Sequence, residues 1–91
     1  MLLLGVSQPP TFHNRILILH PTPTTFNAYV QNTDTQHGYN VTVKTVAVYG
    51  GQARESQQVV QTPAGGKSLI PIVDDIRCTF TFTVLGEAIA Q

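Results

Sequence analysis

The sequence contains few charged side chains. Its 91 residues include five basic and five acidic residues, which make up 11% of the chain and give a net charge of zero. Ordinary globular domains carry about 25% charged residues. A protein that binds nucleic acid needs a basic patch to neutralise phosphates, and a membrane-spanning helix needs about 20 consecutive apolar residues. The sequence has neither feature, so we expect no nucleic-acid partner and no membrane.

The sequence also lacks the cysteine pairs that stabilise many small secreted domains. Its single cysteine, Cys78, cannot form a disulfide within the chain. Because a chain of this length has only a small core, we expect part of its stability to come from neighbouring subunits. Residues 1–6 are apolar but lack the basic segment and the length of a signal peptide. We therefore expect the protein to stay in the producing cell or to leave it inside a particle.

No segment shows the apolar spacing of three and four residues that marks an amphipathic helix, whereas several segments alternate with a period of two. The clearest is residues 76–84. One face would carry Ile76, Cys78, Phe80, Phe82 and Val84, and the other Arg77, Thr79, Thr81 and Thr83. Because side chains alternate along a strand, this pattern predicts a β-strand that is buried on one face. We interpret Cys78 as a small core residue and not as a reactive thiol.

Further strands are predicted within residues 15–19, 26–31, 39–48, 59–60 and 69–73. Residues 15–19 are almost continuously apolar, which is typical of a strand covered on both faces. The apolar residues of segment 39–43 fall on odd positions, whereas Val46 and Val48 fall on even ones. This change of phase predicts a β-bulge near Thr45 or a strand that crosses between two sheets.

Polar turns rich in glycine and proline separate these strands at intervals of about 8–12 residues. The sequence therefore predicts an all-β fold, namely a single antiparallel β-sandwich, Ig-like or jelly-roll, of six to eight strands. We assign residues 1–10 to an extended N-terminal arm, residues 11–86 to the sandwich and residues 87–91 to a C-terminal tail.

No motif indicates catalysis or cofactor binding. The segment 66–68 (GKS) resembles the end of a phosphate-binding loop, but the motif requires a glycine at the position of Gln61. The three histidines lack the spacing of metal ligands, although His37 shares a loop with Asp34. No serine lies in a glycine-rich nucleophile elbow. We therefore expect no enzymatic activity, no cofactor and no metal.

The N-terminal arm and the neutral surface are the features that an isolated globule explains least well. Residues 2–4 are three successive leucines, which are costly to expose. They are expected either to dock on their own domain as an extra strand or to add to the sheet or groove of a neighbour. The polar faces of the predicted strands carry mainly Thr, Gln and Asn, and few of the lysines and glutamates that usually guard sheet edges. Such a surface suits a subunit packed among others.

In its size, low charge, single cysteine and strand spacing, the chain from about Arg15 to Val84 resembles the small β-sandwich structural subunits of virus particles. The capsid decoration (cement) proteins of tailed phages are the nearest class. The resemblance implies a location in the virion and assembly as dimers or trimers. It implies two kinds of partner, which are other copies of the chain and a major capsid or other particle protein. It also implies that the arm and the loop 32–38 make contacts, which gives the candidate interface residues Leu2, Leu3, Leu4, Val6, Asn32, Asp34 and His37.

Our leading hypothesis is a non-enzymatic structural protein that assembles through β-sheet contacts and terminal arms. One alternative is an extracellular fibre or appendage subunit, part of a cell-surface filament, that donates its N-terminal strand. A second alternative is an Ig-like or carbohydrate-binding module. In that case exposed aromatic residues such as Tyr29, Tyr39 and Tyr49 would line up on one face.

Overall fold

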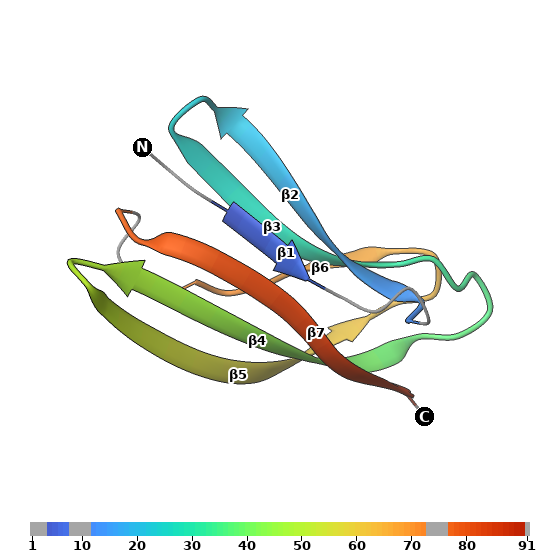
Figure 1. Ribbon diagram of the computed structural model, residues 1–91. Helices are drawn as coiled ribbons and strands as arrows, with labels where there is room; N and C mark the ends of the chain where they lie inside the picture. Colours follow the sequence, from blue (N-terminus) through green and yellow to red (C-terminus); the bar gives the residue numbers. More distant parts are fainter. Residues whose placement is uncertain (1–3, 8–11, 73–76, 91) are drawn as a thin grey trace.

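The computed structural model describes residues 4–7, 12–72 and 77–90, and these residues form β-strands and no helix. The strands are β1 (Leu4–Ser7), β2 (Asn14–Thr22), β3 (Thr25–Asn32), β4 (Tyr39–Tyr49), β5 (Gln52–Thr62), β6 (Lys67–Leu69) and β7 (Thr79–Ile89). One sheet has the order β1-β7-β4-β5 and the other the order β2-β3-β6. Figure 1 shows the sheets as two layers, with β2 and β3 above β7, β4 and β5. The predicted all-β sandwich is confirmed. In the part of the chain that the structure describes, no helix is long and apolar enough to cross a membrane.

The core lies between the two sheets and is centred on β7. Phe80, Phe82 and Val84 are fully buried, as their alternation predicts, and Phe26 of the opposite sheet packs against Phe80 with ring centroids 5.3 Å apart. Cys78 is also buried in this core, which confirms its interpretation as a core residue. The remaining buried members of the core are Ala28, Val30, Tyr39, Val41, Val43, Ala47, Val60 and Ile70.

The expectation that residues 15–19 form a strand covered on both faces is wrong. β2 is the outermost strand of the three-stranded sheet. It is half-buried along residues 16–18, and Leu19 is exposed. The continuous apolar run has a different cause, because Leu17 lies opposite Tyr29 on the outer face. Leu17 and Tyr29 are cross-strand neighbours there, and both are half-buried.

The predicted change of phase near Thr45 is also wrong. β4 alternates without interruption, so Tyr39, Val41, Val43, Thr45 and Ala47 all face the core. The even-numbered valines of β4 lie on the outer face. β-Branched residues are favoured in strands, whether their side chains face the core or the solvent. A valine in a strand therefore predicts the strand but does not identify its buried face.

The irregularity of this sheet lies in β7. Gly86 pairs with Thr42 and Val84 pairs with Val43, so Leu85 is an extra residue without a partner in β4. Such a β-bulge reverses the faces of all residues that follow it. Glu87 consequently lies opposite the buried Val41 and turns toward the inner face. β7 continues to Ile89, so residues 87–89 are part of the sandwich and not of a separate tail.

β1 lies beside β7 of the same chain. It pairs in parallel with residues 80–83, with Leu4 opposite Phe80 and Val6 opposite Phe82. Figure 1 shows β1 along the near side of the sandwich, beside β7. In the single chain, residues 4–7 of the arm therefore form an extra strand on their own sheet, which is the first of the two arrangements expected from the sequence.

Candidate functional site

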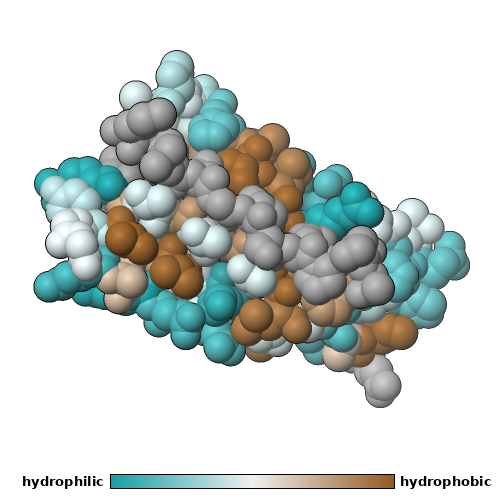
Figure 2. Space-filling view, viewed as in Figure 1, coloured by the Kyte–Doolittle hydropathy of each residue, from teal (hydrophilic) through white to brown (hydrophobic). Residues whose placement is uncertain are grey.

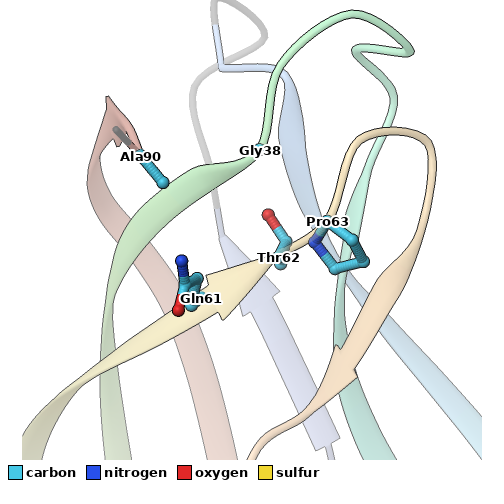
Figure 3. Close-up of a pocket in the computed structure, with 5 residues that line it drawn as sticks. All are labelled: Gly38, Gln61, Thr62, Pro63 and Ala90. Atoms are coloured by element: carbon cyan, nitrogen blue, oxygen red, sulfur yellow. The ribbon is translucent and has the colours of Figure 1, made fainter.

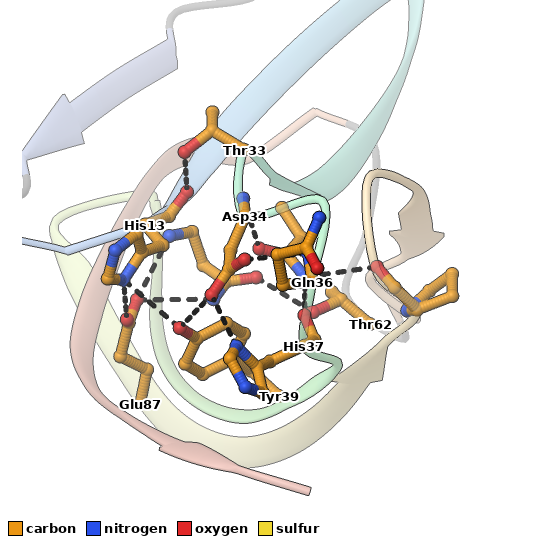
Figure 4. Close-up of polar contacts among 11 residues, drawn as sticks. His13, Thr33, Asp34, Gln36, His37, Tyr39, Thr62 and Glu87 are labelled. Carbon is orange, nitrogen blue, oxygen red and sulfur yellow. Dashed lines mark hydrogen bonds and ion pairs between the residues drawn. The ribbon is translucent and has the colours of Figure 1, made fainter.

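Polar side chains gather at the end of the sandwich where β2 begins and β7 ends. We call them the end cluster, and its members are His13, Asn14, Asn32, Asp34, His37, Tyr39, Thr62 and Glu87. They come from β2, β3, β4, β5, β7 and the loops beside them. Figure 4 shows their side chains joined by hydrogen bonds and ion pairs in one continuous network.

Glu87 is the acceptor at one side of the end cluster. Its carboxylate accepts hydrogen bonds from the backbone N–H of Asn14 at 2.9 Å and from the Asn14 side-chain amide at 3.1 Å. Its second oxygen lies 2.9 Å from Nδ1 of His13. Burial by itself would raise the pKa of Glu87, but the hydrogen bonds from Asn14 and His13 outweigh that effect and lower the pKa. The carboxylate is therefore held in its ionised form.

Asp34 is the acceptor at the other side. The Tyr39 hydroxyl donates to its carboxylate at 2.6 Å, the backbone N–H of Gln36 donates at 2.8 Å, and Nδ1 of His37 lies 3.2 Å away. The hydrogen bond from Tyr39 is the main reason that the pKa of Asp34 lies far below its ordinary value. The same bond, with the negative charge of Asp34, raises the pKa of Tyr39 to about 12.

Tyr39 joins the two sides. Its hydroxyl lies 3.2 Å from Nδ1 of His13, and the two rings stack with centroids 5.5 Å apart. The route from Glu87 through His13 and Tyr39 to Asp34 is thus unbroken. It ties the loop 33–38 to the last strand of the chain.

Two buried asparagines anchor the same end from within. The Asn32 amide donates to the backbone carbonyls of His37 and Pro63, and its oxygen accepts from the N–H of Asp34. The Asn14 oxygen accepts a 2.8 Å hydrogen bond from the Thr62 hydroxyl. These bonds satisfy side chains that would be costly to bury alone, so the buried asparagines support the loop and are not presented to a ligand.

The hydrogen bonds of the end cluster run mainly between its own members. Its carboxylates already accept several hydrogen bonds each, and it contains no serine or cysteine that could act as a nucleophile. Within the described ranges, no three His, Cys, Asp or Glu side chains converge in a way that could hold a metal ion. The imidazoles of His13 and His37 are about half exposed, so the network presents its histidines at the surface.

The structure brings together only some of the candidate interface residues. Asn32, Asp34 and His37 belong to the end cluster, but Asn32 is buried. Leu4 and Val6 belong to β1, which lies beside residues 80–83, whereas the end cluster contacts β7 at Glu87. Leu2 and Leu3 lie outside the described residues. Residues 4–7 and the end cluster therefore border different parts of β7.

Two of the depressions in the surface are lined by residues that the structure describes. The larger is open, measures about 470 Å³ and is lined by Gly38, Gln61, Thr62, Pro63 and Ala90. Figure 3 shows that its polar side chains come from the end of β5, and none of the lining residues is charged. The smaller measures about 230 Å³ and lies between β3 and residues 69–72. Neither combines an apolar pocket with converging charged groups, as a typical small-molecule site does.

The three tyrosines do not form a platform. Tyr39 is buried in the end cluster, and Tyr29 lies under Lys67 on the outer side of the three-stranded sheet. Tyr49 is at the far end of β4, beneath Arg77. These three tyrosines therefore occupy separate places and do not line up on one face.

The outer face of the four-stranded sheet is a large surface of low charge. We call it the threonine face, and strands β4, β5 and β7 give it Thr42, Lys44, Val46, Val48, Ala53, Glu55, Gln57, Val59, Thr79, Thr81 and Thr83. Lys44 and Glu55 are the charged members, and their side chains lie 3.8 Å apart as an exposed pair. Val59 is 66% exposed. Apolar methyl groups and neutral hydroxyls thus dominate this face.

β5 forms the outer edge of the same sheet. It pairs with β4 over its whole length and has no neighbour on its other side in the sheet order. Figure 2 shows the rim of the molecule over this strand as mainly hydrophilic. The sequence identified only residues 59–60 as a strand here, because Gln52 to Gln57 contain no apolar alternation.

Comparison of the chain with protein-family models, with characterised proteins and with solved structures gave no match.

Proposed function

We propose that the protein is a non-enzymatic structural subunit that works by packing against other protein surfaces. The specific role that we propose is a capsid decoration protein or another subunit of a virus particle. Its partners are then other copies of the chain and a major capsid or other particle protein, and its location is the virion. The observation that carries the proposal is the threonine face together with the open edge of β5.

The threonine face supports this proposal through its low desolvation cost. Burying a charged side chain at an interface is expensive unless it is paired, whereas threonine and valine are easily covered. The central strands of this sheet supply only Lys44 as a charged group on the face, and Lys44 already has Glu55 beside it. A soluble monomer normally carries more charge on the open side of a sheet.

The end cluster supports a structural role through its rigidity. Its hydrogen bonds fix the loop 33–38 against β7, and its members face one another more than they face a cleft. A rigid loop at one end of a sandwich is suited to contact with a neighbouring subunit, because little conformational entropy is lost when it binds.

One observation favours the fibre alternative as a second candidate. β1 has four residues and pairs along one side only, so few backbone hydrogen bonds hold it on its own sheet. A strand held so lightly is suited to exchange with a neighbouring copy. Polymers that resist SDS would favour a filament over a virion subunit.

The proposal is tested by measuring the mass of the full chain by light scattering over a range of concentrations, with and without residues 1–7. We expect a mass above that of the monomer for the full chain. A smaller mass after truncation would identify the arm as a contact between copies, and an unchanged oligomer would restrict assembly to the sandwich. A monomer at all concentrations, before and after truncation, contradicts the proposal.

A further inference from the structure

β5 is the longest open edge of the molecule among the described residues. All eleven of its residues pair with β4 without a register shift. The edge strands β1 and β6 have four and three residues, and β2 contains Pro21 and a register shift. Residues 52–57 of β5 are exposed on both faces of the sheet. Figure 1 shows β5 along the lower rim of the sandwich. A long, regular and uninterrupted edge is a template for another strand.

The hairpin turn determines which backbone groups of β5 face outward. Gly50 and Gly51 have φ values of 61° and 78°, as in a two-residue turn whose flanking residues, Tyr49 and Gln52, form a hydrogen-bonded pair. Because such pairs alternate along an antiparallel ladder, the even-numbered residues of β5 bond to β4. The odd-numbered residues direct their N–H and C=O groups away from β4. The Gln61 carbonyl conforms to this, since it accepts a 2.6 Å hydrogen bond from the Ser68 hydroxyl.

The sequence of β5 suits pairing with a second copy of itself. A two-fold axis perpendicular to the sheet leaves each residue on the same face of the sheet in both copies. Residues that oppose one another across the axis must therefore both be even-numbered or both be odd-numbered. An axis at Arg54 or Glu55 would place like charges opposite each other. An axis at Ser56 instead places Arg54 opposite Gln58 and Glu55 opposite Gln57 of the second copy.

The same register also joins apolar and small residues. Ala53 lies opposite the exposed Val59 of the second copy, so each copy covers an apolar side chain of the other. Ser56 meets its own counterpart at the axis, where the two strands approach most closely because this pair is not hydrogen-bonded. The paired stretch is residues 52–60, which ends before Gln61, whose carbonyl is already bonded.

We propose that two copies of this protein pair antiparallel along β5, about a two-fold axis at Ser56, and so join their four-stranded sheets into one continuous sheet. This inference rests on the proposed function and specifies one of its partners. The outward-facing residues 53, 55, 57 and 59 supply the hydrogen bonds between the copies. The interface is narrow, and interfaces below about 1,000 Å² are usually weak, so the dimer is expected to depend on protein concentration.

The test is sedimentation equilibrium of the full chain and of variants at the axis. Ser56→Lys places two ammonium groups opposite each other and is expected to raise the dissociation constant about 10-fold or more. Ser56→Gln is the matched neutral control and should dimerise like the wild type. Mixing Ser56→Lys with Ser56→Glu should restore association as a heterodimer. Gln57→Pro removes an outward N–H without removing a bond to β4, and should also abolish the dimer.

Each outcome separates this inference from the proposed function. A monomeric wild-type protein contradicts both. An oligomer that neither Ser56→Lys nor Gln57→Pro weakens contradicts the pairing of β5 but leaves the proposed function standing. Circular dichroism of each variant shows whether it is folded. If the proline variant is unfolded, the association of Ser56→Lys with Ser56→Glu in a mixture still decides whether β5 pairs with a second copy.

Discussion

The Tyr39 hydroxyl donates a 2.6 Å hydrogen bond to the carboxylate of Asp34, and each residue shifts the ionisation of the other. The ionised form of Asp34 and the neutral form of Tyr39 are the pair that can make this bond. The pKa of Asp34 is therefore lowered and that of Tyr39 is raised. The bond fixes the loop 33–38 to β4.

Replacing Tyr39 with phenylalanine tests this relationship. Tyr39→Phe keeps the ring that stacks on His13 but removes the donor to Asp34. We expect the pKa of Asp34 to rise toward its ordinary value and the loop 33–38 to lose hydrogen-exchange protection. NMR titration of the carboxyl carbons measures the first effect. Tyr49→Phe is the control, since the Tyr49 ring contacts Arg77 at the opposite end of the molecule. An unchanged Asp34 titration would show that the bond does not form in solution.

The stability of the protein should fall at both ends of the pH range. The pKa values of Asp34 and Glu87 are lowered on folding, so their contribution is complete above their unfolded values of 3.8 and 4.5 and is lost as the pH falls below these. The pKa of Tyr39 is raised from 10.0 to about 12, so its contribution is complete below pH 10 and is lost as the pH rises toward 12.

Urea unfolding at a series of pH values measures this profile. The free energy of unfolding should be nearly constant between the two limits and should decline outside them. Tyr39→Phe should flatten the alkaline decline, because the group that titrates there is then absent. If the free energy of the wild type is the same at pH 3 as at pH 7, the proposed role of the two carboxylates is wrong.

Thr45→Val should stabilise the protein. The Thr45 side chain is 4% exposed, and its hydroxyl has no hydrogen-bond partner in the described structure. Valine has nearly the same shape without the polar atom, so the substitution should raise the free energy of unfolding by about 1 kcal/mol. Thr62→Val is the matched contrast, because the buried Thr62 hydroxyl donates to Asn14. That change should lower the free energy by about 1–3 kcal/mol. Equal effects of the two substitutions would argue against this difference in hydrogen bonding.

Glu87→Gln should destabilise the end cluster. The carboxylate accepts hydrogen bonds from Asn14 and lies beside His13, and hydrogen bonds to charged groups contribute about 1.5–3 kcal/mol. Glu55→Gln is the control, because the Lys44–Glu55 pair is exposed and such pairs contribute about 0–1 kcal/mol. Denaturant unfolding should show a larger loss in the free energy of unfolding for Glu87→Gln than for Glu55→Gln. An equal loss for the two variants would contradict the stabilising role of the Glu87 hydrogen bonds.

The strands of this fold were predictable where a buried face alternates with a polar one. Phe80 and Phe82 are in the core because their even positions share one face of β7, and Cys78, just before that strand, continues the same alternation. The sequence was misleading at Val46 and Val48, because threonine at position 45 faces the core while these valines face outward. It was silent on residues 52–57, since an edge strand exposed on both faces has no apolar pattern. The order of the strands in the sheets also left no trace in the periodicity.

The candidate site was predictable only in part. Asp34 and His37 are three residues apart in one loop, so their contact can be anticipated from the sequence. Glu87 meets His13 across 74 positions of the chain, and it does so only because Leu85 is an extra residue in β7. The one signal in the sequence is that the alternation of residues 76–84 stops at Leu85-Gly86, although glycine and leucine do not by themselves specify a bulge.

The bulge at Leu85 makes the length of β7 as important as its composition. Since neighbouring positions point to opposite sides, inserting one residue between Val84 and Glu87 while the bulge is kept would move Glu87 to the outer face and bring Gly86 into its place. Deleting Leu85 would instead remove the extra residue and leave Glu87 opposite Val41. Gradual substitution can tune the ionisable groups at this end, but one added codon here would separate them in a single step. A library of single-codon insertions should therefore show intolerance between Val84 and Glu87 and tolerance at the Gly50-Gly51 turn, whereas deletion of Leu85 should be tolerated.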